Sequence, residues 1–254
     1  MLPGQETTGF IAAEFGNFER ANLTAAASLP ASDTLSFRLS GRYLSQGPAL
    51  DNIATNGAVT APESGGGERD EFGLKAIALY QPTPATQALF NLHYAEDNGI
   101  NQAPLNDSRD VNKHEISIGP DGIQDTDNEF YGSSVKLSHD FGELTLTSLT
   151  AFEGYNQQYG FDFDGTPAPF DVASLNANLS YDRDFSQFSE ELRLNYSSDT
   201  MELMGGLYLE AEEFDQEYLI WCGGLGVDTL LGACRYVGAP GRVGPAPSSD
   251  GTAT

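Results

Sequence analysis

The residues best suited to bind a metal ion lie in an acidic segment, GPDGIQDTDNE. Asp121, Asp125 and Asp127 supply three carboxylates there, and hard cations such as calcium bind several carboxylate and carbonyl oxygens. Their spacing differs from that of the EF-hand loop, so a solvated acidic loop is the competing interpretation. We predict no cofactor apart from a divalent cation held in this loop by the three aspartates.

A second candidate site is the segment FDFDGTPAPFD. Its carboxylates, Asp162, Asp164 and Asp171, could hold a cation or shape a turn. Phe163 contributes to an aromatic character that is unusual for exposed chain and favours ligand contact. We predict that these four residues contact a ligand from a loop, with a solvated turn as the alternative.

The sequence does not favour catalysis. His93, His114 and His139 are scattered too widely to suggest a metal-binding motif. A nucleophile elbow, a phosphate loop and a dinucleotide fingerprint are all absent from the sequence in a strand-to-helix context. We therefore predict that the protein is not an enzyme.

The only two cysteines, Cys222 and Cys234, lie close together in a glycine-rich stretch. An even count at short spacing favours one local disulfide over two free thiols. A disulfide persists in an oxidising compartment such as the periplasm or the cell exterior. The cysteines therefore favour a location outside the cytosol.

Length and composition limit the elements that can position these residues. The chain has 254 residues, of which 39% are hydrophobic and 19% charged, so it should fold as one large β domain or two small ones. No apolar stretch approaches the ~18 to 20 residues of a membrane-spanning helix, so any crossing must use strands. The net charge of −25 argues against nucleic acid as a partner and favours cationic ligands, although acidic residues also simply keep loops solvated.

Hydrophobic periodicity predicts strands throughout the chain. In LSFRLSGRY, apolar side chains alternate with serine and arginine, which gives one apolar and one polar face. Similar or weaker patterns predict about nine strands, at 9–15, 22–29, 35–43, 73–80, 90–94, 134–138, 144–152, 191–196 and 203–214.

The connections between these strands alternate in length. Four short ones carry turn-forming residues near Pro30, Pro82, Gly142 and Asp199. Long polar stretches, predicted to be external loops, lie near 45–69, 97–128, 156–184 and 216–254. A bacterial membrane barrel has short periplasmic turns and long external loops, whereas a sandwich has no reason to sort them in this way.

A barrel wall also requires a polar side that faces the lumen. The alternation predicts lumen-facing positions at Arg38, Arg42, Lys75, Asn91, His93, Lys136, Arg193 and Asn195. Their apolar alternates are expected to face lipid.

Five segments carry a resemblance to a known family: EFGNFERANLTAAASLPASDTLSFRLSGRYLS, ALYQPTPATQALFNLHY, GELTLTSLTAFEGY, FDFDGTP and QFSEELRLNYSSDTMELMGGLYLEAEEF. In this order they resemble successive barrel hairpins of TonB-dependent outer-membrane receptors. The resemblance implies an all-β antiparallel meander in which residues 1–254 form part of a transmembrane β-barrel wall. The family's plug domain and C-terminal strands are expected to lie outside this sequence.

The resemblance also implies a function. Members of this family import a chelated nutrient such as a ferric siderophore across the outer membrane of Gram-negative bacteria. The expected partners are therefore outer-membrane lipid, the TonB energy-coupling protein through the plug region, and a small chelate ligand. Two alternatives fit the alternation as well: a soluble extracellular β-sandwich that serves as a binding or adhesive module, and a small pore that contains all its own strands.

Overall fold

A computed structural model of the protein describes residues 2–52, 55–56, 59–60, 66–100, 114–116, 126–162 and 176–223. Every secondary-structure element in these ranges is a β-strand. Within the same ranges, no helix has the length and hydropathy needed to cross a membrane. The predicted all-β class is confirmed.

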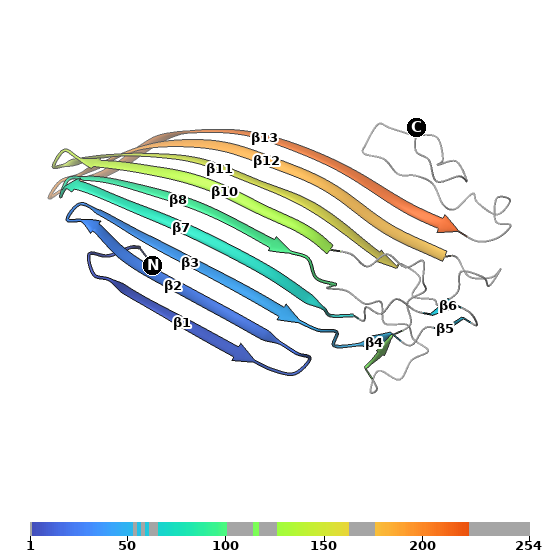
Figure 1. Cartoon of the computed structure of the whole chain (residues 1–254). Coiled ribbons are helices and arrows are strands. Elements are labelled where there is room, and N and C mark those ends of the chain that lie inside the picture. The colour runs from blue at the N-terminus through green and yellow to red at the C-terminus, as the bar shows by residue number, and fades with distance from the viewer. Residues whose placement is uncertain are drawn as a thin grey trace.

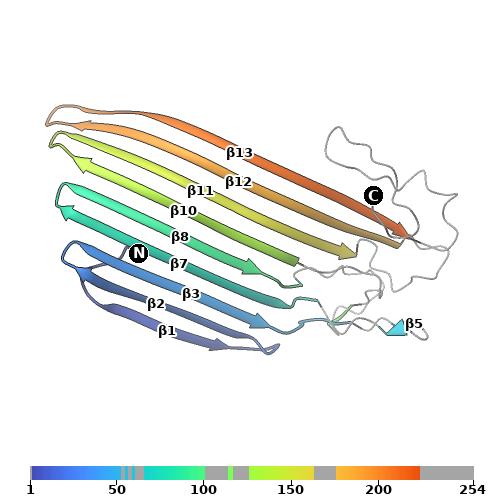
Figure 2. The ribbon, with the colours of Figure 1, turned by 45° about the horizontal axis from the view of Figure 1, so that its top comes forward.

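Nine strands form one antiparallel sheet that follows chain order, as Figure 1 and Figure 2 show. They are β1 (Thr8–Phe15), β2 (Ala21–Ser32), β3 (Leu35–Gln46), β7 (Arg69–Thr83), β8 (Thr86–Asp97), β10 (Thr126–Asp140), β11 (Leu144–Asp162), β12 (Asn176–Ser197) and β13 (Glu202–Gly223). Four two-residue strands make two small separate sheets: β4 (Asp51–Asn52) with β9 (Glu115–Ile116), and β5 (Thr55–Asn56) with β6 (Val59–Thr60). The predicted meander of nine strands is confirmed.

Four short connections of this sheet lie at one end, and a fifth, residues 16–20 between β1 and β2, lies at the other end (Figure 1). Gly142 joins β10 to β11 with a φ of 101°, a conformation that glycine adopts at no steric cost. Its N–H donates to Asp140 Oδ1 at 2.7 Å. In the last hairpin, the Ser198 N–H donates to the Met201 carbonyl at 2.9 Å. All the long connections therefore leave from the opposite end of the sheet.

The predicted loops were too long. β11 continues to Asp162 and β12 begins at Asn176, so both strands extend into the range 156–184. β10 likewise begins within 97–128, and β13 continues to Gly223 within 216–254. Most residues of these extensions are polar or aromatic, apart from a few such as Leu179, Leu219 and Ile220. Apolar alternation therefore stops while the backbone ladder continues.

The strand register confirms that the eight predicted lumen-facing residues share one face. Lys75 is directly opposite His93 on the neighbouring strand. Arg38 is opposite Ile77, and Ile77 in turn is opposite Asn91. Directly opposed residues of a sheet point to the same side, and every second residue along a strand does too.

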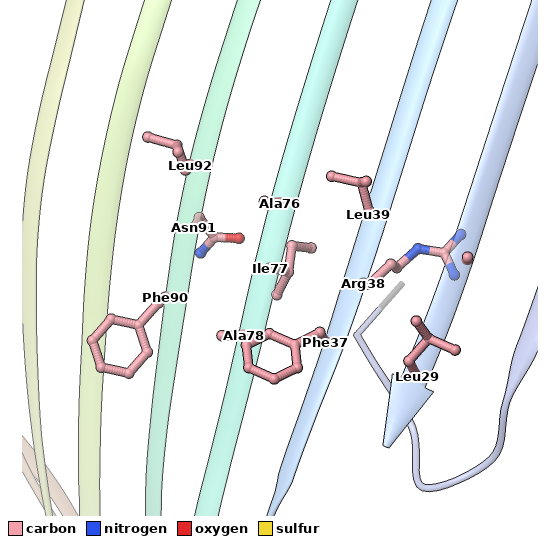
Figure 3. A pocket seen from close by; sticks show the side chains of 11 residues that line it. Leu29, Phe37, Arg38, Leu39, Ala76, Ile77, Ala78, Phe90, Asn91 and Leu92 are labelled. Atoms are coloured by element: carbon pink, nitrogen blue, oxygen red, sulfur yellow. The ribbon is translucent and has the colours of Figure 1, made fainter. Parts of the chain in front are cut away.

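The other face is apolar and exposed. Leu39, Leu92 and Leu207 are 53%, 60% and 72% exposed, and no second layer of the described chain packs on them. In Figure 3, β3 and β8 carry large apolar side chains on either side of the small Ala76 and Ala78 of β7. They line a shallow apolar groove of about 450 Å³. A sandwich would cover this face, so the described part of the chain is not one.

The apolar face has a definite height. It runs from Leu35 to Tyr43 on β3, from Ala88 to Tyr94 on β8 and from Leu203 to Ala211 on β13, starting each time near a short turn. This length suits the ~9 to 11 residues that a tilted strand needs to cross a membrane. Beyond it the same face becomes acidic, with Glu96, Glu129, Asp184 and Asp215 in one register row. The longest strands therefore extend well past the apolar band.

Gly132 allows two strands to interact across a third. His93 on β8 and Glu153 on β11 are both opposite Gly132 on β10, and they form an ion pair with 3.0 Å between Nε2 and Oε2. A Cβ at Gly132 would overlap with the Glu153 carboxylate and crowd the His93 ring. A side chain at this position would therefore push the ends of Glu153 and His93 apart.

The assignment of the apolar and polar faces of the sheet can be tested with two adjacent residues of β3. Leu39→Arg places a charge on the apolar face near the middle of its height, and we expect the free energy of unfolding in lipid vesicles to fall by about 2 to 4 kcal/mol. Ser40→Arg points to the polar face, so we expect a change of about 0.5 kcal/mol or less. Denaturant unfolding of the reconstituted chain measures both values. Equal losses for the two variants would refute the facing assignment.

Gly132 gives a second prediction. Gly132→Ala should cost about 1 kcal/mol or less, because the part-exposed ends of His93 and Glu153 can move apart to admit the methyl group and lose only their mutual contact. Gly73→Ala is the matched control, because it lies on the same face and a Cβ there meets nothing within 4 Å. If the overlap is the cause, adding Glu153→Ala to Gly132→Ala should recover most of the loss in the same unfolding experiment. A loss that persists in the double variant would show a different origin.

Candidate functional site

Three five-residue segments share one pattern, in which aromatic residues flank a polar centre. They are YNQQY at 155–159, YDRDF at 181–185 and FDQEY at 214–218. The first, third and fifth residues of each segment point to the same side of the sheet. The segments lie on β11, β12 and β13, which are consecutive neighbours, so together they form one continuous surface.

The register aligns the three segments. Gln157 is directly opposite Arg183, and Arg183 is directly opposite Gln216. Nine side chains therefore form a three-by-three grid on the polar face, with Arg183 at the centre. We call this surface the aromatic grid; its rows are Tyr155, Phe185 and Phe214, then Gln157, Arg183 and Gln216, then Tyr159, Tyr181 and Tyr218.

The guanidinium of Arg183 is held from three directions. Nε donates to Gln216 Oε1 at 3.0 Å, and Nη1 donates to Gln157 Oε1 at 3.1 Å. The guanidinium carbon lies 4.6 Å from the centre of the Tyr181 ring, which is a cation–π distance. These contacts fix a planar cation in one orientation.

The rings of the aromatic grid contact one another across the strands. Tyr181 stacks with Tyr159, with ring centres 5.6 Å apart, and lies 5.0 Å from Tyr218. In the other row, Tyr155 stacks with Phe185 at 5.1 Å. Such aromatic pairs contribute about 0.5 to 1.5 kcal/mol each beyond area burial. The two rows therefore stabilise the sheet where it extends past the apolar band.

Charge is sorted between the two faces within the three five-residue segments. The residues that alternate with the aromatic grid point to the opposite face and are exposed: Asn156, Gln158, Asp182, Asp184, Asp215 and Glu217. The aromatic grid itself contains no acid, and no ion pair joins Arg183 to a carboxylate within the described residues. In a chain of net charge −25, this surface presents one oriented positive charge among aromatic rings.

The tyrosines do not cancel that charge. Burial, and secondarily the charge of Tyr181, raises the pKa of the Tyr159 and Tyr218 phenols above its ordinary value. Both phenols are therefore neutral at neutral pH. The arrangement can bind an anionic group at Arg183 and a flat ring against the aromatic rows.

The predicted ligand-binding residues lie above the aromatic grid or outside the described residues. Asp162 ends β11, so its assignment to a loop was wrong, because the backbone ladder with β12 extends to it. Phe163, Asp164 and Asp171 lie outside the described residues. Their contact with a ligand stays a prediction.

The predicted cation site is divided in the same way. Asp127 lies on β10, exposed on the outer face, and not in a loop, because pairing with β11 continues to Thr126. Asp121 and Asp125 lie outside the described residues. Within those residues, no cluster of three or more histidine, cysteine or acidic side chains could hold a metal. The loop-bound cation stays a prediction.

The sequence patterns did not single out the aromatic grid. The signal was present, since aromatic and amide or arginine side chains alternate with Asp182, Asp184, Asp215 and Glu217. A search limited to alternation of apolar and polar residues assigns such segments to loops. Counting aromatic residues at intervals of four would have found all three segments.

Comparison with known proteins supports the fold. No family model and no curated protein matches the sequence. The structure is similar to that of the ferric yersiniabactin uptake receptor FyuA from Yersinia pestis, with a TM-score of 0.72 and 13% identity, over 87% of this chain and 33% of that one. It is also similar to a chain of the FpvAI–pyocin S2 complex, with a TM-score of 0.62 and 13% identity, over 86% of this chain and 28% of that one.

These similarities define the class of structure. The sheet has the fold of the barrel wall of TonB-dependent receptors. The chain spans about a third of the length of the receptor FyuA. The predicted barrel-wall architecture is confirmed, and the polar face that carries the aromatic grid corresponds to the lumen side of such a wall.

The cysteines provide a simple test. Cys222 lies on β13 and Cys234 lies outside the described residues, so their pairing stays a prediction. Alkylation of the unfolded, unreduced protein should modify no thiol, and alkylation after reduction should modify two, as measured by intact mass. Two modified thiols before reduction would rule out the disulfide.

Proposed function

We propose that this chain forms part of the barrel wall of an outer-membrane TonB-dependent receptor, and that the receptor imports a small chelated nutrient such as a ferric siderophore. The observation that carries this proposal is the aromatic grid, a ring-lined surface with one oriented cation on the lumen face of a barrel wall. It is a surface suited to holding a ligand, which supports a transport receptor over an enzyme.

The height of the aromatic grid supports an entrance site. The grid lies on the loop side of the apolar band, where β11 to β13 extend past the aromatic residues that end the band. External loops of a bacterial barrel leave from this side. A ligand that arrives from outside the cell would therefore meet the aromatic grid before it enters the membrane-spanning part of the lumen.

The partners follow from the two faces. The apolar face, including the groove along β7, contacts outer-membrane lipid. The lumen face contacts the chelate. The energy for release comes from the TonB protein, through the plug region that receptors of this class carry. Nucleic acid has no complementary surface on these strands, because their outward charges are acidic.

Gene deletion tests the proposal. A strain that lacks the gene for this chain should lose growth on at least one ferric chelate under iron limitation, and the intact gene should restore it. Complementation with Tyr155→Ala plus Phe185→Ala should restore growth less well, whereas Leu192→Ala, on the lipid face, should restore it fully. The measurement is growth and uptake of radioactive iron across a panel of chelates.

The competing soluble module predicts a different result. A secreted binding or adhesive domain would be recovered from the culture fluid or extracted without detergent, and its deletion would leave iron uptake unchanged. Recovery in the outer-membrane fraction, together with a loss of uptake, supports the receptor.

A further inference from the structure

We propose that the ligand of the aromatic grid is an anionic aryl chelate, whose ring-borne oxyanions, as in a catecholate or phenolate, bind Arg183. This inference deepens the proposed function and rests on it. It assigns to Arg183 the selection of ligand charge and to the aromatic rows the selection of ligand rings.

The first support is the way Arg183 is held. Two other arginines of the polar face pair with carboxylates, Arg42 with Glu71 at 3.4 Å and Arg193 with Glu191, whereas Arg38 donates to Ser28 Oγ at 2.8 Å. Arg183 instead binds two amide oxygens, those of Gln157 and Gln216. Amide oxygens orient a guanidinium without neutralising it, so its charge remains available to an anion.

The second support is spacing. On each strand, one aromatic row lies two residues before the row that contains Arg183, and the other lies two residues after it. Two residues of an extended strand span about 7 Å. An aryl ring can therefore lie against either row while an oxygen on its edge reaches the guanidinium. A chelate without rings would leave both rows uncovered.

The third support is the cost of binding. Immobilising a free arginine side chain costs free energy that is lost from affinity. Here the hydrogen bonds and the Tyr181 contact have already ordered the guanidinium. The neutral phenols of Tyr159 and Tyr218 offer no competing anion. The surface should therefore repel cationic chelates and bind neutral chelates only weakly.

Equilibrium dialysis with radioactive iron tests the inference on the chain folded in detergent micelles. The probes are ferric 2,3-dihydroxybenzoate, which is anionic and aromatic, ferric citrate, which is anionic without rings, and ferric acetohydroxamate, which is neutral without rings. We expect the first to bind at least about tenfold more tightly than the other two.

Variants separate charge from structure. Arg183→Gln should weaken binding of ferric 2,3-dihydroxybenzoate about tenfold to a hundredfold, because a charged hydrogen bond is lost. Arg183→Lys should recover part of the affinity, since it restores the charge without the planar fork. Arg193→Gln is the control on the same face and should change binding little.

The outcomes distinguish the two proposals. Equal binding of all three probes, or no effect of Arg183→Gln, would overturn the aryl-anion inference and leave the receptor proposal standing. No binding of any probe would also overturn the inference, and the deletion experiment would then decide the receptor proposal separately. Preferential binding that is lost with Arg183→Gln supports both.

Discussion

The rest of this structure depends on one constraint, which is that a single antiparallel layer must remove its apolar face from water without a second layer. Leu39, Leu92 and Leu207 are all more than half exposed, and nothing in the described chain covers them. At about 25 cal/mol per Å² of apolar surface, leaving such a face in water would offset much of what the ladder contributes. In the proposed barrel, lipid would resolve the problem, because it would cover the face without competing for backbone hydrogen bonds.

That constraint also explains why the long strands can change character along their length. Near the short turns, lipid fixes one face as apolar and leaves the other free to carry polar groups. Past the apolar band neither face is constrained by lipid, so β11 to β13 carry acids on one side and rings on the other. Pairing is then stabilised by cross-strand contacts, such as Tyr155 with Phe185 and Tyr181 with Tyr218. The proposed binding surface therefore lies beyond the apolar band.

The same division sets how much could be predicted from the sequence. All nine strands were predictable because lipid imposes apolar alternation on a segment of each, and turns such as that at Gly142 carry local signals. The strand ends on the loop side could not be predicted, because backbone pairing continues there without apolar alternation, as at Asp162 and Asp127. The aromatic grid was missed for the same reason. Its residues are informative only when three segments distant in sequence are aligned, and register provides that alignment.

The acidity of the chain shapes how Arg183 can act. Asp182 and Asp184 flank it in sequence but point to the opposite face, so they repel an approaching anion from a distance and do not contact it. At physiological ionic strength such fields decay over about 8 Å, whereas a direct guanidinium contact is screened much less. An anion therefore gains nothing from long-range attraction and must be recognised at close range. Under the proposed recognition, ligands whose charge and rings both fit the aromatic grid would bind more tightly than anions that offer charge alone.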